Sequence, residues 1–375
     1  MTVSSTARVP IGSAGRVYLA TLAAYLTADF IAPISGSILS GLDAGALVVP
    51  FCAAFALAFP FWGRVADRQA AGLVLAVSLV ALGVAGLLLV VAPSNAVVVI
   101  ARALQGAAAA GVPPTAQAAL AARAGNASAG RAVSGMMIMV AVATLGGPAL
   151  ATGLEGVLGW RATSVLLGVL PAVAAAGLCM PLRGVASGTR GSLRASPQLV
   201  AGWACSTLVL AAYWTLLTRW ESIADGVGIG FDTSTLLPLA GAVGIPLVVL
   251  AGRSADRLGP RAPMVRTMTA GAAALAVAAL AHSQLLFLAG ACAALALYWS
   301  YLPVVSVQIQ RSAPADARAS AAGVLYSSMW LGAALGGLAA VAAPNWRWIV
   351  GGAALAWALA GAVAWRGFHP EPSAA

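Results

Sequence analysis

The chain has 375 residues, of which 61% are hydrophobic and only 8% are charged, and its mean hydropathy is +0.94. A soluble globular chain carries roughly a quarter charged residues, so this composition excludes a soluble protein. The formal charge of +10 comes from arginines that stand mostly in short breaks between apolar stretches. This placement favours a role in membrane topology over a nucleic-acid partner.

Apolar stretches of about 20 residues recur along the whole chain, and each is long enough to cross a bilayer core of roughly 30 Å as a helix. We therefore predict an all-α membrane protein. Breaks at clusters of arginine, aspartate, proline and glycine predict twelve spans, near residues 17–40, 44–62, 72–92, 96–120, 132–155, 161–182, 198–219, 233–251, 262–281, 285–310, 318–342 and 347–365.

The segment 183–197 lies between the sixth and seventh spans and is rich in glycine, serine and arginine, which predicts a flexible cytoplasmic linker. The chain then divides into an N-terminal six-helix half, residues 1–182, and a C-terminal six-helix half, residues 198–375, with a short cytoplasmic tail. If the N-terminus is cytoplasmic, 16 of the 20 arginines lie on that side, three lie on the other and Arg102 lies within a span. This asymmetry predicts a multi-pass protein of the cell membrane with both termini in the cytoplasm.

Asp29 in the first span and Arg102 in the fourth are the two ionisable residues that lie well inside the predicted spans. At a rise of about 1.5 Å per residue, each lies about 10 Å from the outer edge of a core about 30 Å thick, so they share one depth. A charge within a span is costly and usually faces a cavity or a partner. Two interpretations are open: a structural ion pair, or a proton-coupling site in which Asp29 binds and releases a proton as Arg102 moves.

Two short motifs recur after about half the length of the chain. GRVADR at 63–68 returns as GRSADR at 252–257, and GWR at 159–161 returns as NWR at 345–347, with offsets of 189 and 186. The repeats predict a parallel duplication of a six-span unit. Transporters built in this way bind their substrate between the halves, near the middle of the membrane.

With these motifs the chain resembles the major facilitator superfamily over nearly its full length. The family's loop between the second and third spans has a glycine, then Asp-Arg, and it is matched here by Gly63, Asp67 and Arg68 and again by Gly252, Asp256, Arg257 and Arg261. By resemblance, this loop is a conformational latch that holds the cytoplasmic side shut in the outward-open state. An aspartate just ahead of a helix can cap its free N–H groups. The alternative is that these charges only set topology.

Two further spans carry patterns of this family. The fourth span resembles the family's arginine–glutamine–glycine pattern through Arg102, Gln105 and Gly106. The fifth span resembles the glycine–proline motif that marks proton-coupled exporters. The matching residues are Gly146, Gly147, Pro148 and Gly153, and the glycine pair that usually follows the proline is missing. Such glycines permit close helix contact, and the proline is expected to bend the span.

Aromatic and polar residues deep within the spans are the candidates for a substrate cavity, namely Tyr25, Gln105, Tyr213, Trp214, Tyr298, Tyr301 and Tyr326. Such side chains suit a bulky, partly apolar substrate. For any one of them, core packing or an interfacial belt is the alternative. No cofactor or metal is expected, because the four cysteines lie singly in apolar segments and the chain has only two histidines.

The sequence therefore favours a proton-coupled antiporter that exports a small amphiphilic drug or metabolite by alternating access. A proton-coupled importer of a small nutrient, with the same fold, is the alternative. An intramembrane enzyme is disfavoured because no HExxH or GxSxG motif is present, and a receptor that does not transport would not need Asp29. The expected partners are a small-molecule substrate, protons and the lipid bilayer, and the protein is expected to be a monomer that binds no nucleic acid.

Overall fold

Residues 12–39, 45–125, 127–182, 193–229 and 236–368 are described by the computed structural model of the chain. Within these ranges the chain forms helices and no strands, so the predicted all-α fold is confirmed. Both chain termini and residues 183–192 of the predicted linker lie outside the described residues, so their location and role stay predictions.

The helices of the first part of the chain are α1 (Gly12–Asp29), η1 (Ala32–Ile34), α2 (Ser35–Ile38), α3 (Gly45–Arg68), α4 (Ala71–Val90), α5 (Asn95–Ala109), α6 (Val112–Ala124), α7 (Ala129–Ser164), the π-helical η2 (Val165–Val169) and α8 (Leu170–Cys179). The second part contains α9 (Pro197–Thr218), α10 (Trp220–Val227), α11 (Leu236–Leu258), α12 (Arg261–Ala279), α13 (Gln284–Ser312), η3 (Ala315–Ala317), α14 (Arg318–Ala342) and α15 (Trp346–Gly367).

Nine helical segments of the described residues are long and apolar enough to cross a membrane. One of them, Ala129–Cys179, has 51 residues, which is about twice the length of a single span. It divides at Gly159, whose φ of +76° is not helical. With this division, and with α1 and α11 added, the described helices are consistent with the twelve predicted spans.

Two predicted spans are broken within the bundle. The first ends as α1 at Asp29 and continues as the short η1 and α2. The fourth divides between α5 and α6, and Pro113 and Pro114 stand in the first turn of α6, where a missing N–H breaks no helical hydrogen bond. Pro148, which is expected to bend the fifth span, lies inside α7, and the residue of α7 with non-helical backbone angles is Gly159.

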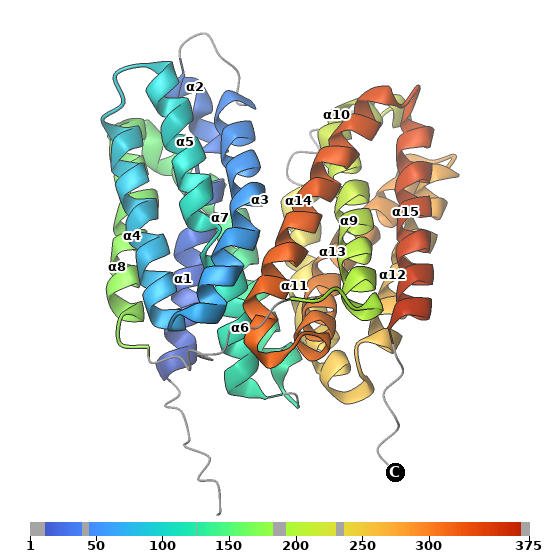
Figure 1. Cartoon of the computed structure of the whole chain (residues 1–375). Coiled ribbons are helices and arrows are strands. Elements are labelled where there is room, and N and C mark those ends of the chain that lie inside the picture. The colour runs from blue at the N-terminus through green and yellow to red at the C-terminus, as the bar shows by residue number, and fades with distance from the viewer. Residues whose placement is uncertain (1–11, 40–44, 126, 183–192, 230–235, 369–375) are drawn as a thin grey trace, which may run out of the picture.

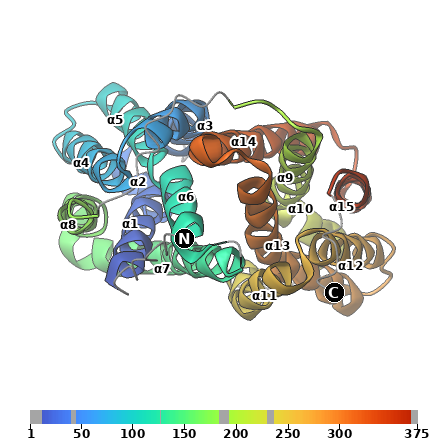
Figure 2. The same ribbon diagram turned by 60° about the horizontal axis from the view of Figure 1, so that its bottom comes forward.

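The helices gather in two groups, α1–α8 and α9–α15 (Figure 1). The groups contact each other along two seams. In the first seam α3 lies against α14, and in the second seam α7 lies against α11, on the opposite side of the bundle (Figure 2). Helices α6 and α13 lie between the seams and also contact across the groups. The division into six-helix halves at the predicted boundaries stays a prediction.

We call the end of the bundle at which α3 ends and α14 begins the closed end; it lies at the bottom of Figure 1. From this end α3 and α14 diverge toward the other end of the bundle (Figure 1). The helices of the first seam therefore lie closest together at the closed end (Figure 1).

Candidate functional site

A buried arginine donates hydrogen bonds to the end of the first helix, where the first span is broken. Because α1 ends at Asp29, the carbonyl groups of Thr27 and Ala28 in its last turn have no helical partner. Arg102 of α5 is 1% exposed, and it donates from Nη1 to the oxygen of Thr27 (3.4 Å) and from Nη2 to that of Ala28 (3.3 Å). Its Nε donates to the oxygen of Leu47 in α3 (3.2 Å). The C-terminal end of a helix is partially negative, so the guanidinium supplies both donors and the opposite charge.

Two further contacts hold Arg102 in this position. Its Nη1 donates to Oε1 of Gln105 at 2.8 Å, and its guanidinium lies over the ring of Phe51, 4.5 Å from the centroid. Gln105 is itself only 1% exposed. The structure therefore places this predicted substrate ligand in the wall of the bundle, as a partner of the arginine.

The carboxylate of Asp29 has a different partner. Its Oδ2 accepts a hydrogen bond of 2.7 Å from Oγ1 of Thr144 in α7, and its Oδ1 accepts none from the described residues. Asp29 and Arg102 interact electrostatically, but no ion pair within 4.0 Å joins these two described residues. The direct ion pair is thus not formed in this conformation, and the partly exposed carboxylate keeps one free oxygen.

Aromatic side chains from both groups of helices surround Asp29. Tyr213 of α9 stacks on Tyr298 of α13, with ring centroids 3.8 Å apart, and it lies within electrostatic range of Asp29. Tyr25 stands one turn before Asp29 on α1 and packs edge-on against Phe55 of α3, with centroids 6.4 Å apart. The structure therefore brings the predicted residues Tyr25, Tyr213 and Tyr298 together with the carboxylate, across the boundary between the groups.

A groove opens between α3 and α14, and Trp214 lines it. The cavity has a volume of about 840 Å³, which lies within the range of small-molecule sites. Trp330 lies beside Trp214, with centroids 6.1 Å apart, and Phe55 contacts Trp330 at 5.6 Å. Phe55 therefore stands between this apolar groove and Tyr25.

The remaining two predicted tyrosines lie closer to the closed end. Tyr301 is 0% and Tyr326 is 1% exposed. The ring of Tyr326 stacks on Phe59 at 5.2 Å, and its hydroxyl donates to Oε1 of Gln117 in α6 at 2.9 Å. In this conformation Tyr326 belongs to the contacts between the groups, whereas the ring of Tyr301 packs against Tyr298 of its own helix.

An aspartate closes the first seam. Oδ1 of Asp67 accepts from the backbone N–H of Ala319, and Oδ2 accepts from that of Ser320, both at 2.8 Å. These amides lie in the first turn of α14, where they have no partner within the helix. Gly63 permits the approach, because a Cβ there would lie 2.6 Å from the oxygen of Ala319. The carboxylate of one group thus caps a helix of the other.

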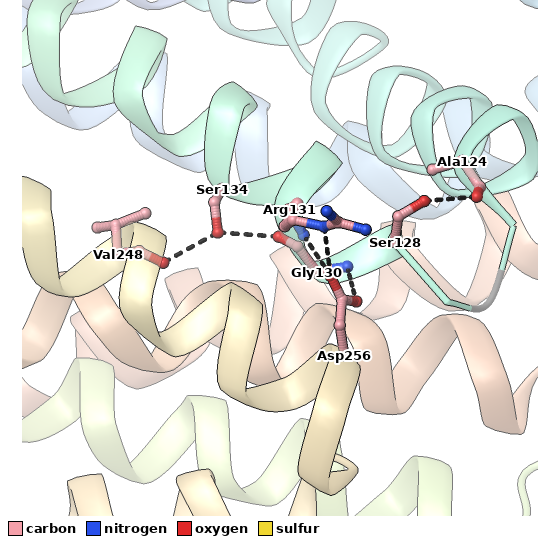
Figure 3. Close-up of polar contacts among 7 residues, drawn as sticks. All are labelled: Ala124, Ser128, Gly130, Arg131, Ser134, Val248 and Asp256. Atoms are coloured by element: carbon pink, nitrogen blue, oxygen red, sulfur yellow. Dashed lines mark hydrogen bonds and ion pairs between the residues drawn. The ribbon is translucent and has the colours of Figure 1, made fainter.

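The second seam is closed in the same way (Figure 3). Oδ1 of Asp256 accepts from the N–H of Gly130 at 2.7 Å, and Oδ2 accepts from that of Arg131 at 3.1 Å, in the first turn of α7. The side chain of Arg131 adds an ion pair with Asp256 at 3.4 Å. One turn further on, the hydroxyl of Ser134 donates to the oxygen of Val248 at 2.9 Å.

The two seams match residue by residue at an offset of 189. This offset relates the two capping aspartates, the two close-packed glycines Gly63 and Gly252, and the capped amides of α14 and α7. It also relates Ser134 to Gly323, where a Cβ would lie 2.5 Å from the oxygen of Phe59. The second seam therefore has an ion pair and a side-chain hydrogen bond where the first has close backbone packing.

The other predicted latch residues lie outside these caps. Arg68 and Arg257 are exposed, and neither forms an ion pair with the opposite group among the described residues. Arg261 lies over the ring of Trp365, 4.2 Å from the centroid, within its own group of helices. The arginines of the motif therefore do not close the seams in this conformation.

The glycine–proline motif of α7 packs against α1. A Cβ on Gly147 would lie 3.1 Å from Leu26, whereas Gly146 and Gly153 have open space beside them. Gly147 thus permits the close contact of α7 and α1 that holds Thr144 beside Asp29.

The profile of the Major Facilitator Superfamily matches residues 17–337. The chain belongs to this superfamily. No curated protein matches its sequence. The structure is similar to that of the human organic anion transporter MFSD10 (TETRAN), with 14% sequence identity and a TM-score of 0.73. It is also similar to that of a bacterial homologue of the iron transporter ferroportin in the outward-facing state, with 18% sequence identity and a TM-score of 0.75. In each case 95% of this chain and 98% of the other are covered, and at these identities the likeness shows the fold alone.

Membership of the superfamily makes this chain a multi-pass membrane transporter and not an enzyme. Transporters of this superfamily move small molecules across a membrane. The site around Asp29 lies between the two groups of helices, where transporters built from two repeats bind their substrates.

Sequence reasoning missed Thr144, Phe55 and Gln117. A signal for Phe55 is present, since Phe51, Phe55 and Phe59 recur every four residues and so share one face of a helix. Thr144 and Gln117 are single polar residues in apolar helices. Their partners lie 115 and 189 or more residues away, so no local pattern marks them.

We predict that Arg102→Met destabilises the protein strongly. The substitution leaves the carbonyl groups of Thr27 and Ala28 at the end of α1 without these donors, at about 1–3 kcal/mol each, so the unfolding temperature in detergent should fall sharply or the protein should fail to fold. The matched control is Arg161→Met. Arg161 also donates to a carbonyl at a helix end, that of Val90 at 3.1 Å, but it is exposed, and we expect a loss below about 1 kcal/mol. Equal losses from both substitutions would contradict the buried cap.

We predict that Asp67→Asn and Asp256→Asn both open the closed end, because each removes a charged cap worth about 1–2 kcal/mol across a seam. Asp256→Asn should act more strongly, since it also removes the ion pair with Arg131. Distances between spin labels at the exposed Gln69 and Leu258, in a variant without its native cysteines, measure the opening. Asp225→Asn, an exposed carboxylate on α10, is the control. Unchanged distances in both cap variants would show that these loops only set topology.

Proposed function

We propose that this transporter is a proton-coupled antiporter that exports a small amphiphilic drug or metabolite by alternating access. The observation that carries the proposal is the carboxylate of Asp29, which lies between the two groups of helices; one oxygen is held by Thr144, and the other accepts no hydrogen bond from the described residues. Uphill transport requires a group that binds a proton in one conformation and releases it in another. Asp29 meets this requirement because its partners Thr144 and Arg102 stand on helices other than its own.

The surroundings of Asp29 support an amphiphilic substrate. Stacked rings of Tyr213 and Tyr298 and the edge of Tyr25 offer flat apolar surfaces, while the free carboxylate oxygen offers a single charge. The donors of Arg102 that face α1 and α3 are engaged with carbonyl groups, so in this conformation the arginine acts on Asp29 through its charge and forms no ion pair with it. A molecule with an apolar body and a cationic group fits this arrangement.

The charge distribution supports an outward-facing conformation in the cell membrane. Arginines cluster at the closed end, where α3, α6, α11 and α13 end and α7 and α14 begin. Because arginines are enriched on the cytoplasmic side of membrane proteins, we assign the closed end, both termini and the linker to the cytoplasm. A monomer is sufficient for this mechanism, since both groups of helices belong to one chain.

An importer that moves a proton and a nutrient together would use the same carboxylate. Export is favoured by the glycine–proline motif, which occurs in α7 through Gly147 and Pro148 and whose counterpart in α14 has no proline.

We predict that Asp29→Asn abolishes uphill transport driven by a pH gradient in proteoliposomes, while substrate exchange without a gradient persists. The amide keeps the shape of the side chain but cannot carry the coupled proton. Glu155→Gln is the control, because Glu155 is a carboxylate that bonds to Ser37 outside the site. Asp29→Asn that pumps at the parental rate would refute the coupling role, and loss of pumping in Glu155→Gln would show that the assay does not isolate the site.

We predict that the site discriminates charge at constant shape. Tetraphenylphosphonium and tetraphenylborate have nearly the same shape and opposite charge, and the aromatic faces and free carboxylate should bind the cation at least tenfold more tightly. Quenching of tryptophan fluorescence at pH 8 measures both affinities. The preference should disappear in Asp29→Asn. Tighter binding of the borate would instead indicate an anion site and would remove the support for a cationic amphiphile.

A further inference from the structure

A polar cluster ties the two groups of helices together between the candidate site and the closed end. Oε1 of Gln117 in α6 accepts two hydrogen bonds from the other group, from the hydroxyl of Tyr326 in α14 at 2.9 Å and from that of Ser306 in α13 at 3.2 Å. The three side chains are at most 1% exposed. One carbonyl oxygen thus joins three helices from both groups.

The cluster lies on the axis that relates the two repeats. Gln117 and Ser306 are 189 residues apart, which is the offset that relates Asp67 to Asp256. The hydrogen bond between them therefore joins equivalent positions of the two repeats, and such positions can meet only near the axis. Any rotation of one group against the other about the site changes the contacts of this cluster.

The hydrogen bonding of the cluster is incomplete on its donor side. Nε2 of Gln117 and the hydroxyl of Tyr301 are buried without a hydrogen-bond partner among the described residues. Tyr301 lies within electrostatic range of Tyr326. Buried polar groups are usually paired, and leaving one unpaired is unfavourable. The accepting oxygen of Gln117 thus favours the closed conformation, whereas the unpaired groups oppose it.

A chain of ring contacts connects this cluster with the candidate site. Tyr25, next to Asp29, contacts Phe55 at 6.4 Å; Phe55 contacts Phe59 at 4.4 Å; and Phe59 stacks on Tyr326 at 5.2 Å. The hydroxyl at the end of this chain is the one that bonds to Gln117. The cluster is therefore connected with the site through the packed rings of Phe59 and Phe55.

We propose that Gln117 is the positioning residue for alternating access: its carbonyl oxygen ties the groups together while the closed end is shut. When that end opens, Gln117 and both tyrosine hydroxyls become a polar surface for hydrogen-bonding groups of the substrate. The hydrogen bonds of Gln117 and the two capped seams stabilise the same closed conformation. Nε2 of Gln117 and the hydroxyl of Tyr301, which have no hydrogen-bond partner among the described residues, limit the stability of this conformation, so that it can open. This assignment depends neither on proton coupling nor on the direction of transport.

The test compares two substitutions of the same kind. Tyr326→Phe removes a hydrogen bond between the groups, whereas Tyr301→Phe removes a buried hydroxyl that has no hydrogen-bond partner among the described residues. The ratio of closed to open molecules is measured in lipid nanodiscs from the spin-label distance between Gln69 and Leu258. We expect Tyr326→Phe to lower this ratio about threefold to tenfold, the effect of one hydrogen bond. Tyr301→Phe should leave the ratio unchanged or raise it.

A double-substitution cycle assigns the effect to Gln117. Gln117→Leu should lower the ratio at least as much as Tyr326→Phe, and the combination should add little to Gln117→Leu alone, because both remove the same bond. If Gln117→Leu does not fold, Ser306→Ala replaces it, with Ser300→Ala as control; Ser300 is also buried in α13 but bonds to Leu297 of its own helix. Equal shifts in Tyr301→Phe and Tyr326→Phe, or no shift in Tyr326→Phe, would overturn the proposal.

Discussion

Every backbone polar group inside a bilayer must find a partner within the protein, and this constraint bears most heavily on the end of α1. The helix stops at Asp29 within its span, which leaves carbonyl groups facing apolar surroundings. Arg102 satisfies them from a neighbouring helix. The carboxylate of Asp29 stands at this helix end, beside Thr144, because Arg102 supplies hydrogen-bond donors to the carbonyl groups there. The buried charge of Arg102, which is unfavourable by itself in an apolar span, thus stabilises the helix end at which Asp29 lies.

The two seams contain the same sequence motif but differ in the number of polar contacts that join the two groups of helices. Both aspartates cap a helix that belongs to the other group, with nearly the same hydrogen-bond lengths. The seam at α7 has the additional contacts of Arg131 and Ser134, whereas the seam at α14 relies on the close approach of Gly323. Since the additional ion pair and side-chain hydrogen bond lie in the seam at α7, we expect that separating this seam costs more free energy than separating the seam at α14.

The sequence predicts the features that have a period, a composition or a repeat. Hydropathy indicated the spans, the offset of 189 indicated the paired aspartates, and a count of residues placed Asp29 and Arg102 at one depth. The acceptors of Arg102 are backbone carbonyl groups, which every residue carries, so no residue type identifies them in advance. Gln105 shares a helix face with Arg102, and this spacing was compatible with a cavity; its amide is instead bound to the arginine. Contacts between the groups, such as that of Gln117 with Tyr326, depend on how the repeats pack and have no local signal.

The caps that cross the seams also bear on how the protein is made. While only the first group of helices has been synthesised, Asp67 has no helix to cap, and the first turn of α7 has no carboxylate to receive its amides. Both become satisfied when α11 and α14 arrive. An unfinished or wrongly assembled chain therefore differs from the finished one at the same end of the bundle, by an uncapped helix and an unpartnered acid.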